Sequence, residues 1–326
     1  MCKFKFVAVV FCSVVASCAA QYAPAVGIPG TTAMHKDSSL FVGWATNCTI
    51  QPGFQDISSV SLGYAAAGDS SFAVGVAGAN ATVSLGDGGA ATVTFMQPIF
   101  NGQGFDFAVF ENSFSDSFLE LAFVEVSSDG TNYFRFPSHS LTDTTTQVGT
   151  FGTLDPTKIN NLAGKYRAMY GTPFDLEELP DTNLLDKNSI THVRIVDVVG
   201  SVNAMYASYD SYGNKVNDPW PTPFPSGGFD LDAVGVIHQK GTGLFDSNAN
   251  EVIVIEIRNS QIAINLKDEN SYVQVVLTDV LAREIYSFVF YDTSFIEIPL
   301  STLVSGINCI TVISDKDIVT KKINLN

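Results

Sequence analysis

The sequence predicts an all-β protein of two β-sandwiches, and three observations support this prediction. Short runs of β-branched and aromatic residues recur along the chain, separated by clusters of Gly, Asp, Asn and Ser. No helical heptads and no repeat of about 20–50 residues are present. A polar segment rich in Gly, Asn and Ser, residues 241–250, divides the strand-like runs into two groups. The two groups predict two domains, residues 21–240 and 251–326.

The composition is that of a folded, acidic chain. Hydrophobic residues make up 46% of the 326 residues, which is enough for real cores, and 15% are charged, against about 25% in average proteins. The formal net charge is −16. Such a surface repels phosphate backbones, so a nucleic acid is not expected as a partner. An acidic surface suits Ca²⁺, although solubility alone also explains it.

Residues 1–20 have the three parts of a secretory signal peptide. A basic start is followed by an apolar run, Phe6–Ala16, and by small residues that end at Ala20. The run is too short to span a bilayer, which takes about 20 apolar residues. Cleavage after Ala20 is the favoured prediction, and lipidation of Cys18 in a lipobox is the alternative. No later segment is apolar enough to span a membrane, so we expect a secreted or surface-attached protein.

Seven short strands are predicted in residues 21–240. Some of them are apolar on both faces, as in Leu119–Val126. Both faces of the sheets are therefore expected to be covered, as in a closed barrel or a sandwich with loops over its outside. The predicted strands are Ser71–Ala77, Ala90–Phe95, Phe105–Phe110, Leu119–Ser127, Tyr133–Phe136, Thr191–Val199 and Phe229–Ile237.

A long loop rich in aromatic residues lies between Val199 and Phe229. Loops of this length inside compact domains are usually functional or disordered. Aromatic faces stack on the apolar faces of sugar rings, so these residues are a candidate platform for a glycan. The alternative is that they pack the loop onto the sandwich. The candidate ligand-binding residues are Tyr206, Tyr209, Tyr212, Trp220 and Phe224.

Two acidic residues in the last strand of the first domain are candidate metal ligands. Asp230 and Asp232 are two apart, so a regular strand places both on one face, together with Val234 and Val236. Carboxylates near a core are costly unless they are paired or bind an ion. Ca²⁺ takes six to eight oxygen ligands, of which such a pair supplies two or three.

Asp106 and Glu111 flank another apolar strand and are expected to converge on the same Ca²⁺. The alternative is that these carboxylates accept hydrogen bonds from loop amides, or pair with Arg194 or Lys215. No other cofactor is predicted.

No catalytic residue is predicted. The four histidines lack metal-binding spacing, and no nucleophile motif is complete. Glu120 and Glu125 share a predicted strand but lie on opposite faces, which makes them a poor pair for glycoside hydrolysis. Other carboxylate pairs stay open.

The C-terminal 76 residues, 251–326, contain seven predicted strands, the size of a small Ig-like sandwich. The segment Val273–Ile285, with Asp279 and Arg283, resembles the strand-turn-strand motif of the type IX secretion C-terminal sorting domain of Bacteroidetes. Ser305–Ile307 and Val319–Ile323 are similar to its closing motifs. The resemblance implies recognition by an outer-membrane translocon. The alternative is an ordinary Ig-like module.

Residues 40–238 resemble an uncharacterised family of secreted bacterial cell-surface proteins, a resemblance that implies no mechanism. The last strand is also similar to jelly-roll carbohydrate-binding modules, which often hold a structural Ca²⁺. The segments that resemble the surface-protein family include Leu85–Gly89, Phe105–Asn112, Phe118–Gly130, Asn161–Tyr166, Gly171–Leu176 and Gly227–Gly235.

Taken together, the sequence predicts a signal peptide, a jelly-roll-like β-sandwich, a linker and an Ig-like sorting sandwich. The expected function is a non-enzymatic, exported binding protein whose ligand is a carbohydrate or glycoconjugate. An extracellular polysaccharide hydrolase that uses Asp or Glu residues and a structural adhesin are the alternatives.

Overall fold

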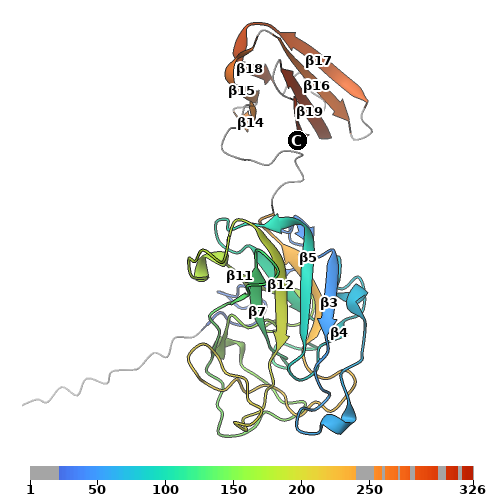
Figure 1. Ribbon diagram of the computed structural model, residues 1–326, viewed down its shortest axis with the longest axis vertical. Coiled ribbons are helices and arrows are strands. Elements are labelled where there is room, and N and C mark those ends of the chain that lie inside the picture. The colour runs from blue at the N-terminus through green and yellow to red at the C-terminus, as the bar shows by residue number, and fades with distance from the viewer. Residues whose placement is uncertain are drawn as a thin grey trace, which may run out of the picture. The chain divides into compact units, whose positions relative to one another are not determined.

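The computed structural model divides the chain into two units, Met1–Lys240 and Gly241–Asn326, called here unit 1 and unit 2 (Figure 1). The predicted signal peptide, residues 1–20, and the predicted linker, residues 241–250, lie outside the described residues. The structure describes residues 22–239 of unit 1 and residues 253–258, 261–270, 272–279, 283–299, 306–314 and 318–325 of unit 2.

The described parts of the chain are all-β, as predicted. Their helices are 3-10 segments of three or four residues, and none is long and apolar enough to cross a bilayer. The predicted strand Ser71–Ala77 is wrong: its first residues belong to the 3-10 helix η2. The reason is local, because the side chain of Asp69 accepts a hydrogen bond from the amide of Ser71 and begins the helix. The segments are η1 (Val60–Leu62), η2 (Ser70–Ala73), η3 (Pro156–Lys158) and η4 (Leu176–Glu178).

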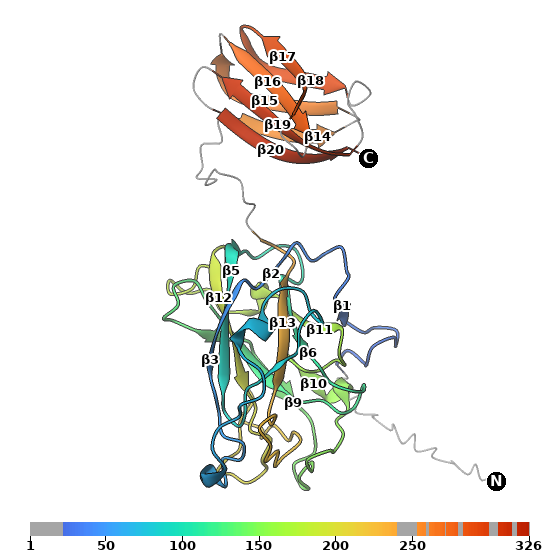
Figure 2. The same ribbon diagram turned by 90° about the vertical axis from the view of Figure 1, so that its right-hand side faces the viewer.

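Unit 1 is a sandwich of two antiparallel sheets, seen edge-on in Figure 2. The first sheet has the order β1-β11-β6-β13-β2, with β4 also pairing β13, and the second has the order β3-β5-β12-β7-β8. A short ladder joins β9 (His139–Ser140) to β10 (Ile159–Asn160). The strands of the first sheet are β1 (Met34–His35), β2 (Gly43–Trp44), β4 (Val83–Ser84), β6 (Phe107–Glu111), β11 (Tyr170–Phe174) and β13 (Asp230–Val236). Those of the second are β3 (Asn47–Gln51), β5 (Ala90–Ile99), β7 (Ala122–Ser127), β8 (Phe134–Arg135) and β12 (Ile190–Asp197).

The main core lies between the two sheets. Phe107 and Val109 of β6 belong to one buried cluster with Val124 of β7 and Val193 and Ile195 of β12. These residues alternate along their strands, so each strand turns one set of side chains inward. Fully burying one side chain of this size stabilises the fold by about 1.5–3 kcal/mol.

The outer faces are also covered, as the two-sided apolar strands predict. Phe110, on the other face of β6, lies 5.6 Å from Phe41 and 5.4 Å from Trp44 between ring centroids. On the second sheet, Phe123 of β7 packs under loop residues that include Leu119 and Leu162. Segments of irregular backbone therefore complete the core on both sides of the sandwich.

A β-bulge in β13 changes which of its residues share a face. The register with β6 shifts between Leu231 and Ala233, and Leu231, Val234 and Val236 all belong to the core between the sheets. The prediction that Asp230 and Asp232 share a face with Val234 and Val236 is therefore wrong. The extra residue of a bulge reverses the alternation that the sequence pattern assumes.

The longest loops of unit 1 gather at one end of the sandwich. Strand β6 ends and β13 begins there, because Glu111 pairs with Leu231, and β12 ends opposite Ala122 of β7. The loops at this end are residues 112–121 and 198–229, together with the turn 85–89. Figure 1 shows this loop end at the bottom of unit 1.

Unit 2 consists of a three-stranded sheet, β14-β15-β18, and a four-stranded sheet, β17-β16-β19-β20. One apolar cluster, which includes Ile264, Val275 and Ile310, contains residues of both sheets. Arg283 donates to Asp279 between β16 and β17, with Nε–Oδ2 at 2.7 Å. The strands are β14 (Ile253–Arg258), β15 (Gln261–Asn270), β16 (Val273–Asp279), β17 (Glu284–Phe290), β18 (Thr293–Pro299), β19 (Gly306–Ser314) and β20 (Ile318–Leu325).

Candidate functional site

Hydrogen bonds hold two long loops of unit 1 against each other. The buried Asn217 side chain accepts from the amide of Val148 (2.9 Å) and donates to the carbonyl oxygens of Asp143 (2.6 Å) and Thr146 (2.8 Å). The amide of Trp220 donates back to the Val148 carbonyl oxygen at 3.0 Å. These contacts fix residues 143–148 beside residues 217–220.

A third loop joins the same surface. The amide of Leu154 donates to the carbonyl oxygen of Ser117 (2.7 Å), and Thr150 Oγ1 donates to that of Pro221 (2.7 Å). Residues 112–121, 143–154 and 217–228 are thus connected to one another by backbone contacts.

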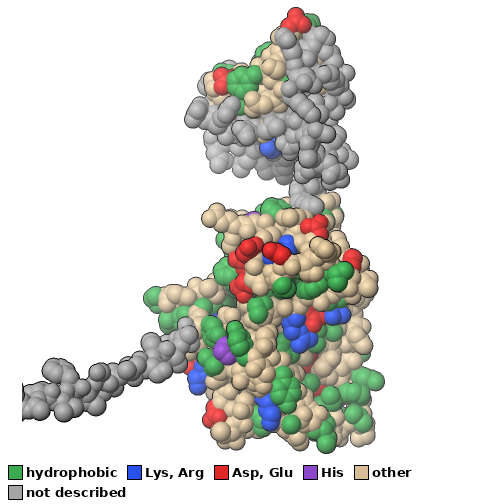
Figure 3. Space-filling view, turned by 60° about the vertical axis from the view of Figure 1, so that its left-hand side comes forward, with side chains coloured by type: hydrophobic (Ala, Val, Ile, Leu, Met, Phe, Trp, Pro, Cys, Tyr) green, Lys and Arg blue, Asp and Glu red, His purple; other side chains and the backbone are tan. Residues whose placement is uncertain are grey.

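Four phenylalanine rings from these loops form a continuous row, called here the Phe row. Ring centroids are 5.9 Å apart for Phe114 and Phe118, 6.4 Å for Phe118 and Phe151, and 6.3 Å for Phe151 and Phe224. The successive interplanar angles are 26°, 30° and 25°. Phe114 is 85% exposed, Phe151 78% and Phe224 41%. Figure 3 shows hydrophobic side chains (green) at the surface of unit 1, including its loop end.

Polar groups lie next to the Phe row. Asp116, between Phe114 and Phe118 in the sequence, accepts two hydrogen bonds from Arg167 Nη1, at 2.7 and 2.8 Å. The loop that holds Phe151 also borders a hollow of about 430 Å³. Thr142 Oγ1 is buried there without a hydrogen-bond partner. The hollow is lined by Thr142, Asp143, Thr146, Gln147, Val148, Thr153, Leu154, Asp155 and Lys158.

The structure places the predicted aromatic platform in three locations. Phe224 is one end of the Phe row. Trp220 is half-buried and donates from Nε1 to Asp87 (3.1 Å), with the Tyr206 ring 6.1 Å from its own. This pair therefore packs the loop onto the sandwich, which was the alternative that the sequence left open.

Tyr209 and Tyr212 are exposed and form the third location, away from the other three aromatic residues. The centroid of the Tyr212 ring lies 4.2 Å from that of the His139 ring. His139 Nδ1 shares a hydrogen bond of 2.5 Å with the Tyr22 hydroxyl. No ring–ring contact joins Tyr209 or Tyr212 to the Phe row among the described residues.

The sequence did not predict Phe114, Phe118 or Phe151 as site residues. Phe114 and Phe151 stand among Ser, Thr, Gly and Asp residues, outside any alternating apolar run, whereas Phe118 directly precedes the predicted strand Leu119–Ser127. A large ring in such a segment has no neighbouring apolar positions with which to form a buried face. That isolation was the available signal for exposed aromatic side chains.

Two of the four predicted metal ligands lie elsewhere in unit 1. Asp106, at the end of the sandwich opposite the long loops, accepts from the amides of Gly102 and Leu176 and pairs with His238 Nδ1 at 2.7 Å. Burial raises its pKa. The amide and histidine contacts are those of a structural carboxylate rather than of an ion ligand.

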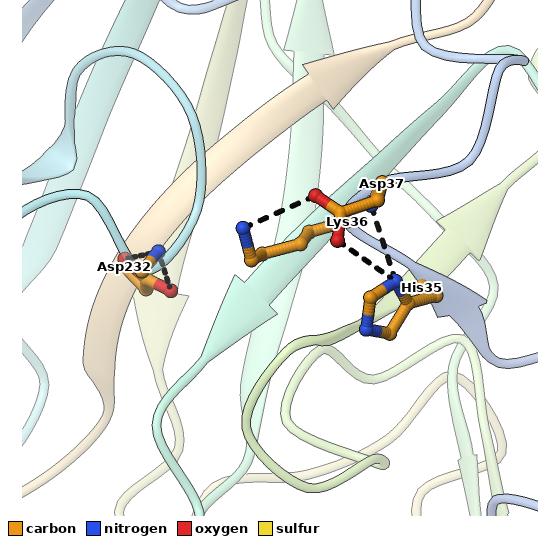
Figure 4. Close-up of polar contacts among 5 residues, drawn as sticks. His35, Lys36, Asp37 and Asp232 are labelled. Atoms are coloured by element: carbon orange, nitrogen blue, oxygen red, sulfur yellow. Dashed lines mark hydrogen bonds and ion pairs between the residues drawn. The ribbon is translucent and has the colours of Figure 1, made fainter.

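Asp232 has its own partners on the outside of the first sheet. Both of its oxygens accept from the amide of Gly78, at 3.0 and 2.9 Å. Lys36 extends toward Asp232 and contacts Asp37 at 3.2 Å (Figure 4). Burial raises the pKa of Asp232, and the Gly78 amide and Lys36 oppose that shift.

The suggested partners Arg194 and Lys215 do not contact these carboxylates. Arg194 pairs with Glu125 at 2.5 Å, and Lys215 donates to the carbonyl oxygen of Val202 at 2.5 Å. Glu125 also binds Arg135 at 2.7 Å.

The other two predicted ligands belong to a larger group of acids at the loop end, called here the carboxylate cluster. Four of its members are buried, while Glu120 and Asp230 are partly exposed. Three members, Asp87, Glu120 and Asp197, were not predicted as ion ligands from the sequence. Asp218 was one of several loop oxygen donors for which Ca²⁺ binding and Asx-turn hydrogen bonds were equally good explanations. The signal was an acid inside or beside an apolar run, as at Asp197 in Ile195–Val199. The six residues are Asp87, Glu111, Glu120, Asp197, Asp218 and Asp230.

Hydrogen bonds to neighbouring amides hold the cluster together. Asp197 accepts from the amides of Gly88 (3.0 Å) and Phe229 (2.7 Å), which are adjacent in sequence to Asp87 and Asp230. Gly228, with φ of 74°, allows this approach, because a Cβ there would lie 2.7 Å from the Asp197 carboxylate.

The remaining members are connected in the same way. Asp218 accepts from the amide of Leu121 (2.7 Å), the residue after Glu120. Glu111, at the end of β6, pairs with the strand position that follows Asp230 in β13. Acidic side chains from six places in the chain therefore lie near one another at the loop end, where their charges interact.

Burial raises the pKa of every carboxyl group in the cluster, and the neighbouring acids add to the effect in most of them. Burial and the charge of Asp230 raise the pKa of Glu120 to about 8. Burial raises the pKa of Asp230 to about 6, despite hydrogen bonds from Ser84 and Asn112. The pKa of Glu111 is held well above its usual range by burial and then by Glu120 and Asp230.

Two oxygens of the cluster have no hydrogen-bond partner. They are Glu111 Oε1 and Asp218 Oδ1, on side chains that are 1% and 3% exposed. Among the described residues, no three Asp, Glu, His or Cys side chains are already gathered closely enough to coordinate one ion.

Comparisons with known proteins do not assign the chain to a family. No family model matches it, and no curated protein matches it. Among solved structures, it is similar to a Ruminococcus gnavus β-glucuronidase bound to uronic isofagomine, with a TM-score of 0.24 and 10% identity over 93% of this chain and 45% of that one. The same enzyme with an N1-substituted uronic isofagomine gives a TM-score of 0.23 and 12% identity, over 93% and 48%. The chain thus spans about half the length of these structures, and a likeness this weak bears on neither fold nor activity.

Proposed function

We propose that the chain is an exported, non-enzymatic binding protein whose ligand is a carbohydrate, bound along the Phe row. The observation that supports this most is the row itself: four rings at interplanar angles of 25–30°, three of them exposed, on loops that are joined by hydrogen bonds. Exposed aromatic faces of this kind stack on the apolar faces of sugar rings. Isolated exposed rings are common, but a continuous series points to an interaction site.

The polar groups beside the row suit sugar hydroxyls. Asp116 and Arg167 offer an acceptor and donors at one part of the row, and the hollow beside Phe151 offers threonines, carboxylates and Lys158. Such mixed surroundings, an apolar face with a few placed polar groups, are typical of small-ligand sites. The net charge of −16 disfavours polyanionic glycans, so we expect a neutral one.

Export is the second part of the proposal, supported by the sequence of residues 1–20 and by the resemblance of residues 251–326 to type IX sorting domains. Unit 1 then functions outside the cell, attached to the surface or released. A glycan-binding module is one class of protein for which that location is useful.

A glycan array probed with the chain from Gln21 to Asn326 tests the binding. We expect neutral polysaccharides among the positive spots. Phe151→Ala weakens that binding by about tenfold, since losing one stacked ring costs on the order of 1.4 kcal/mol. Met96→Ala, which removes an equally exposed apolar side chain from β5, is the control and leaves binding unchanged.

Three other outcomes of the glycan array would change the proposed function. An array without any positive glycan refutes the carbohydrate proposal and favours the structural adhesin. Binding that survives Phe151→Ala but is lost in Tyr212→Ala moves the site to the two exposed tyrosines. Release of shorter sugars from a bound polysaccharide supports the hydrolase instead.

A further inference from the structure

A second exposed aromatic surface lies at the loop end, outside the Phe row. The rings of Phe54 and Tyr64 are stacked, with centroids 4.8 Å apart and an interplanar angle of 19°. Tyr64 is nevertheless 56% exposed. Because Phe54 covers one face of the Tyr64 ring, the other face and the hydroxyl group are open to solvent. This stacked pair is called here the Tyr64 platform.

The segment that leads to Tyr64 carries two further exposed apolar side chains. Val60 is 57% exposed and Leu62 is 46% exposed, and η1, which contains both, has no buried residue. These side chains therefore contribute nothing to the core. Single exposed apolar residues are common on protein surfaces, whereas several in one place indicate an interaction site.

Backbone contacts connect the Tyr64 platform to the turn 85–89. Phe54 forms isolated β-bridges with both Tyr64 and Asp87. The amide of Phe54 donates to the carbonyl oxygen of Asp87 (3.2 Å), and the amide of Asp87 donates to that of Phe54 (2.7 Å). A Cβ on Gly53 would lie 2.4 Å from the Asp87 carbonyl oxygen, so this close approach requires glycine.

The Tyr64 platform is also connected to the loop that holds one end of the Phe row. The amides of Ala66 and Ala67 donate to the carbonyl oxygen of Pro225, at 2.8 and 3.0 Å. Two Cα steps, one hydrogen bond and one further Cα step join Tyr64 to Phe224, so their Cα atoms are at most about 18 Å apart. No ring–ring contact joins these two side chains among the described residues.

We propose that the Tyr64 platform is a second sugar subsite, so that the protein binds a neutral polysaccharide along its chain rather than at one terminal sugar. The inference rests on the proposed function, because the Phe row is the first subsite. The open face of Tyr64 suits the apolar face of a sugar ring, and its hydroxyl suits a sugar hydroxyl. A short run of linked sugars spans the distance from Phe224 to Tyr64.

Two subsites on connected loops raise the affinity for a long chain without a strong contact at either one. Once one part of a polysaccharide stacks on the Phe row, the next part is held near the Tyr64 platform at a high effective concentration. A sugar too short to reach both surfaces gains nothing from the second. The affinity therefore rises with chain length until both subsites are occupied.

Affinity electrophoresis of the chain from Gln21 to Asn326, in native gels that contain mannan, xylan, β-glucan or starch, tests the proposal. The polysaccharide that retards the protein is then cut to disaccharides and octasaccharides, and calorimetry measures the binding of each. We expect the octasaccharide to bind about tenfold more tightly than the disaccharide, since only the longer fragment reaches both subsites.

Substitutions at Tyr64 separate the two subsites. Tyr64→Ala and Tyr64→Leu lower the affinity for the octasaccharide by about tenfold and leave that for the disaccharide unchanged. Leucine keeps an apolar contact with Phe54, so a folding defect of the alanine variant does not decide the test. Tyr64→Phe, which keeps the ring, retains octasaccharide binding within about threefold, the effect of losing one weak hydrogen bond.

Leu184→Ala is the matched control, because Leu184 is 57% exposed and precedes β12, at the end of the sandwich opposite the long loops. It leaves the binding of both fragments unchanged. Melting temperatures of all variants, compared with that of the unsubstituted chain, show whether each is folded.

Failure of this inference can be told apart from failure of the proposed function. If no polysaccharide retards the unsubstituted chain, both are refuted. If Phe151→Ala loses binding while Tyr64→Leu binds both fragments as the unsubstituted chain does, only the second subsite is refuted. A dimer seen by light scattering that Tyr64→Leu abolishes would assign the Tyr64 platform to a second copy of the chain, and would also overturn the inference.

Discussion

Lys165 is an almost fully buried lysine between irregular segments of unit 1. Its ammonium donates to the carbonyl oxygen of Ile159 at 2.8 Å and lies 5.6 Å from the Tyr166 ring centroid and 6.0 Å from that of Tyr22. Burial lowers its pKa to about 8. The charged form is therefore less favourable in the folded protein than in the unfolded chain, where a lysine titrates near about 10.4.

This shift predicts a stability that rises between pH 7 and pH 9. Over that range the folded state releases the Lys165 proton while the unfolded state keeps it, so the free energy of unfolding increases with pH. The gain from this one group is about 1 kcal/mol. Urea unfolding of the unsubstituted chain and of Lys165→Met at pH 7, 8 and 9 gives the free energy of unfolding at each pH. The gain from Lys165 is the difference between the two proteins in how steeply this free energy rises with pH.

Lys158→Met, which removes an exposed lysine seven positions earlier, is the control for losing one positive charge. The expected result is a steeper pH dependence in the unsubstituted chain than in Lys165→Met. Identical slopes for these two proteins would contradict the shifted pKa.

Single residues also show which part of the candidate site the sequence could reveal. Phe224, Glu111 and Asp230 were predicted as site residues and lie in the Phe row or the carboxylate cluster. Trp220 was predicted as a ligand contact but donates to Asp87, 133 positions away. A partner that distant cannot be inferred from spacing along the chain, so the division of an aromatic loop into buried and exposed rings appears only in the fold.

At the level of elements, two long loops depend on one buried amide. Asn217 is fully buried, and its side chain makes three hydrogen bonds to the backbone of residues 143–148. Its loss removes the partner of the Val148 amide and of the carbonyl oxygens of Asp143 and Thr146, and leaves a space in the buried position of the side chain. The position of the Phe151 loop relative to Phe224 depends on this connection.

Asn217→Ala is therefore expected to lower the free energy of unfolding by about 2–3 kcal/mol, the cost of unpaired buried polar groups. Limited proteolysis should also cut residues 143–154 faster than in the unsubstituted chain. Denaturant unfolding measures the first effect and mass spectrometry of the fragments locates the second. Asn183→Ala, at an exposed position of another loop, should change stability by less than about 0.5 kcal/mol. Equal losses in the two variants would mean that Asn217 does not anchor the loops.

The strands were more predictable than the loops. Alternation and β-branched content gave β5, β6, β7, β12 and β13 to within a few residues, because those signals are local. The bulge at Asp232 was not predictable, since it depends on how β13 pairs with β6. The segment Ser71–Ala77 was misassigned because the Asp69 cap outweighs its strand-like composition.

At the scale of the whole molecule, each unit has a core of its own. The apolar clusters of unit 1 contain only residues up to Val236, and that of unit 2 begins at Ile255. A domain that has its own hydrophobic core can fold without the rest of the chain. The jelly-roll topology of unit 1 and the sorting role of unit 2 stay predictions from sequence resemblance.

Truncation of the chain after Lys240 separates the stability of unit 1 from the export proposed for unit 2. Calorimetry should show the melting transition of unit 1 at the same temperature in the truncated and complete chains, because none of its core residues is removed. In a bacterium with a type IX pathway, the complete chain should reach the medium or the cell surface, whereas the truncated chain should stay in the periplasm. The complete chain with Phe151→Ala is the control for export, since it alters an exposed ring of unit 1 and keeps residues 251–326. Export of the truncated chain at the same level would contradict the sorting role, while a lowered melting temperature would contradict the independence of the two cores. The two readouts fail separately, so the fold of unit 1 can be tested even if its route out of the cell is a different one.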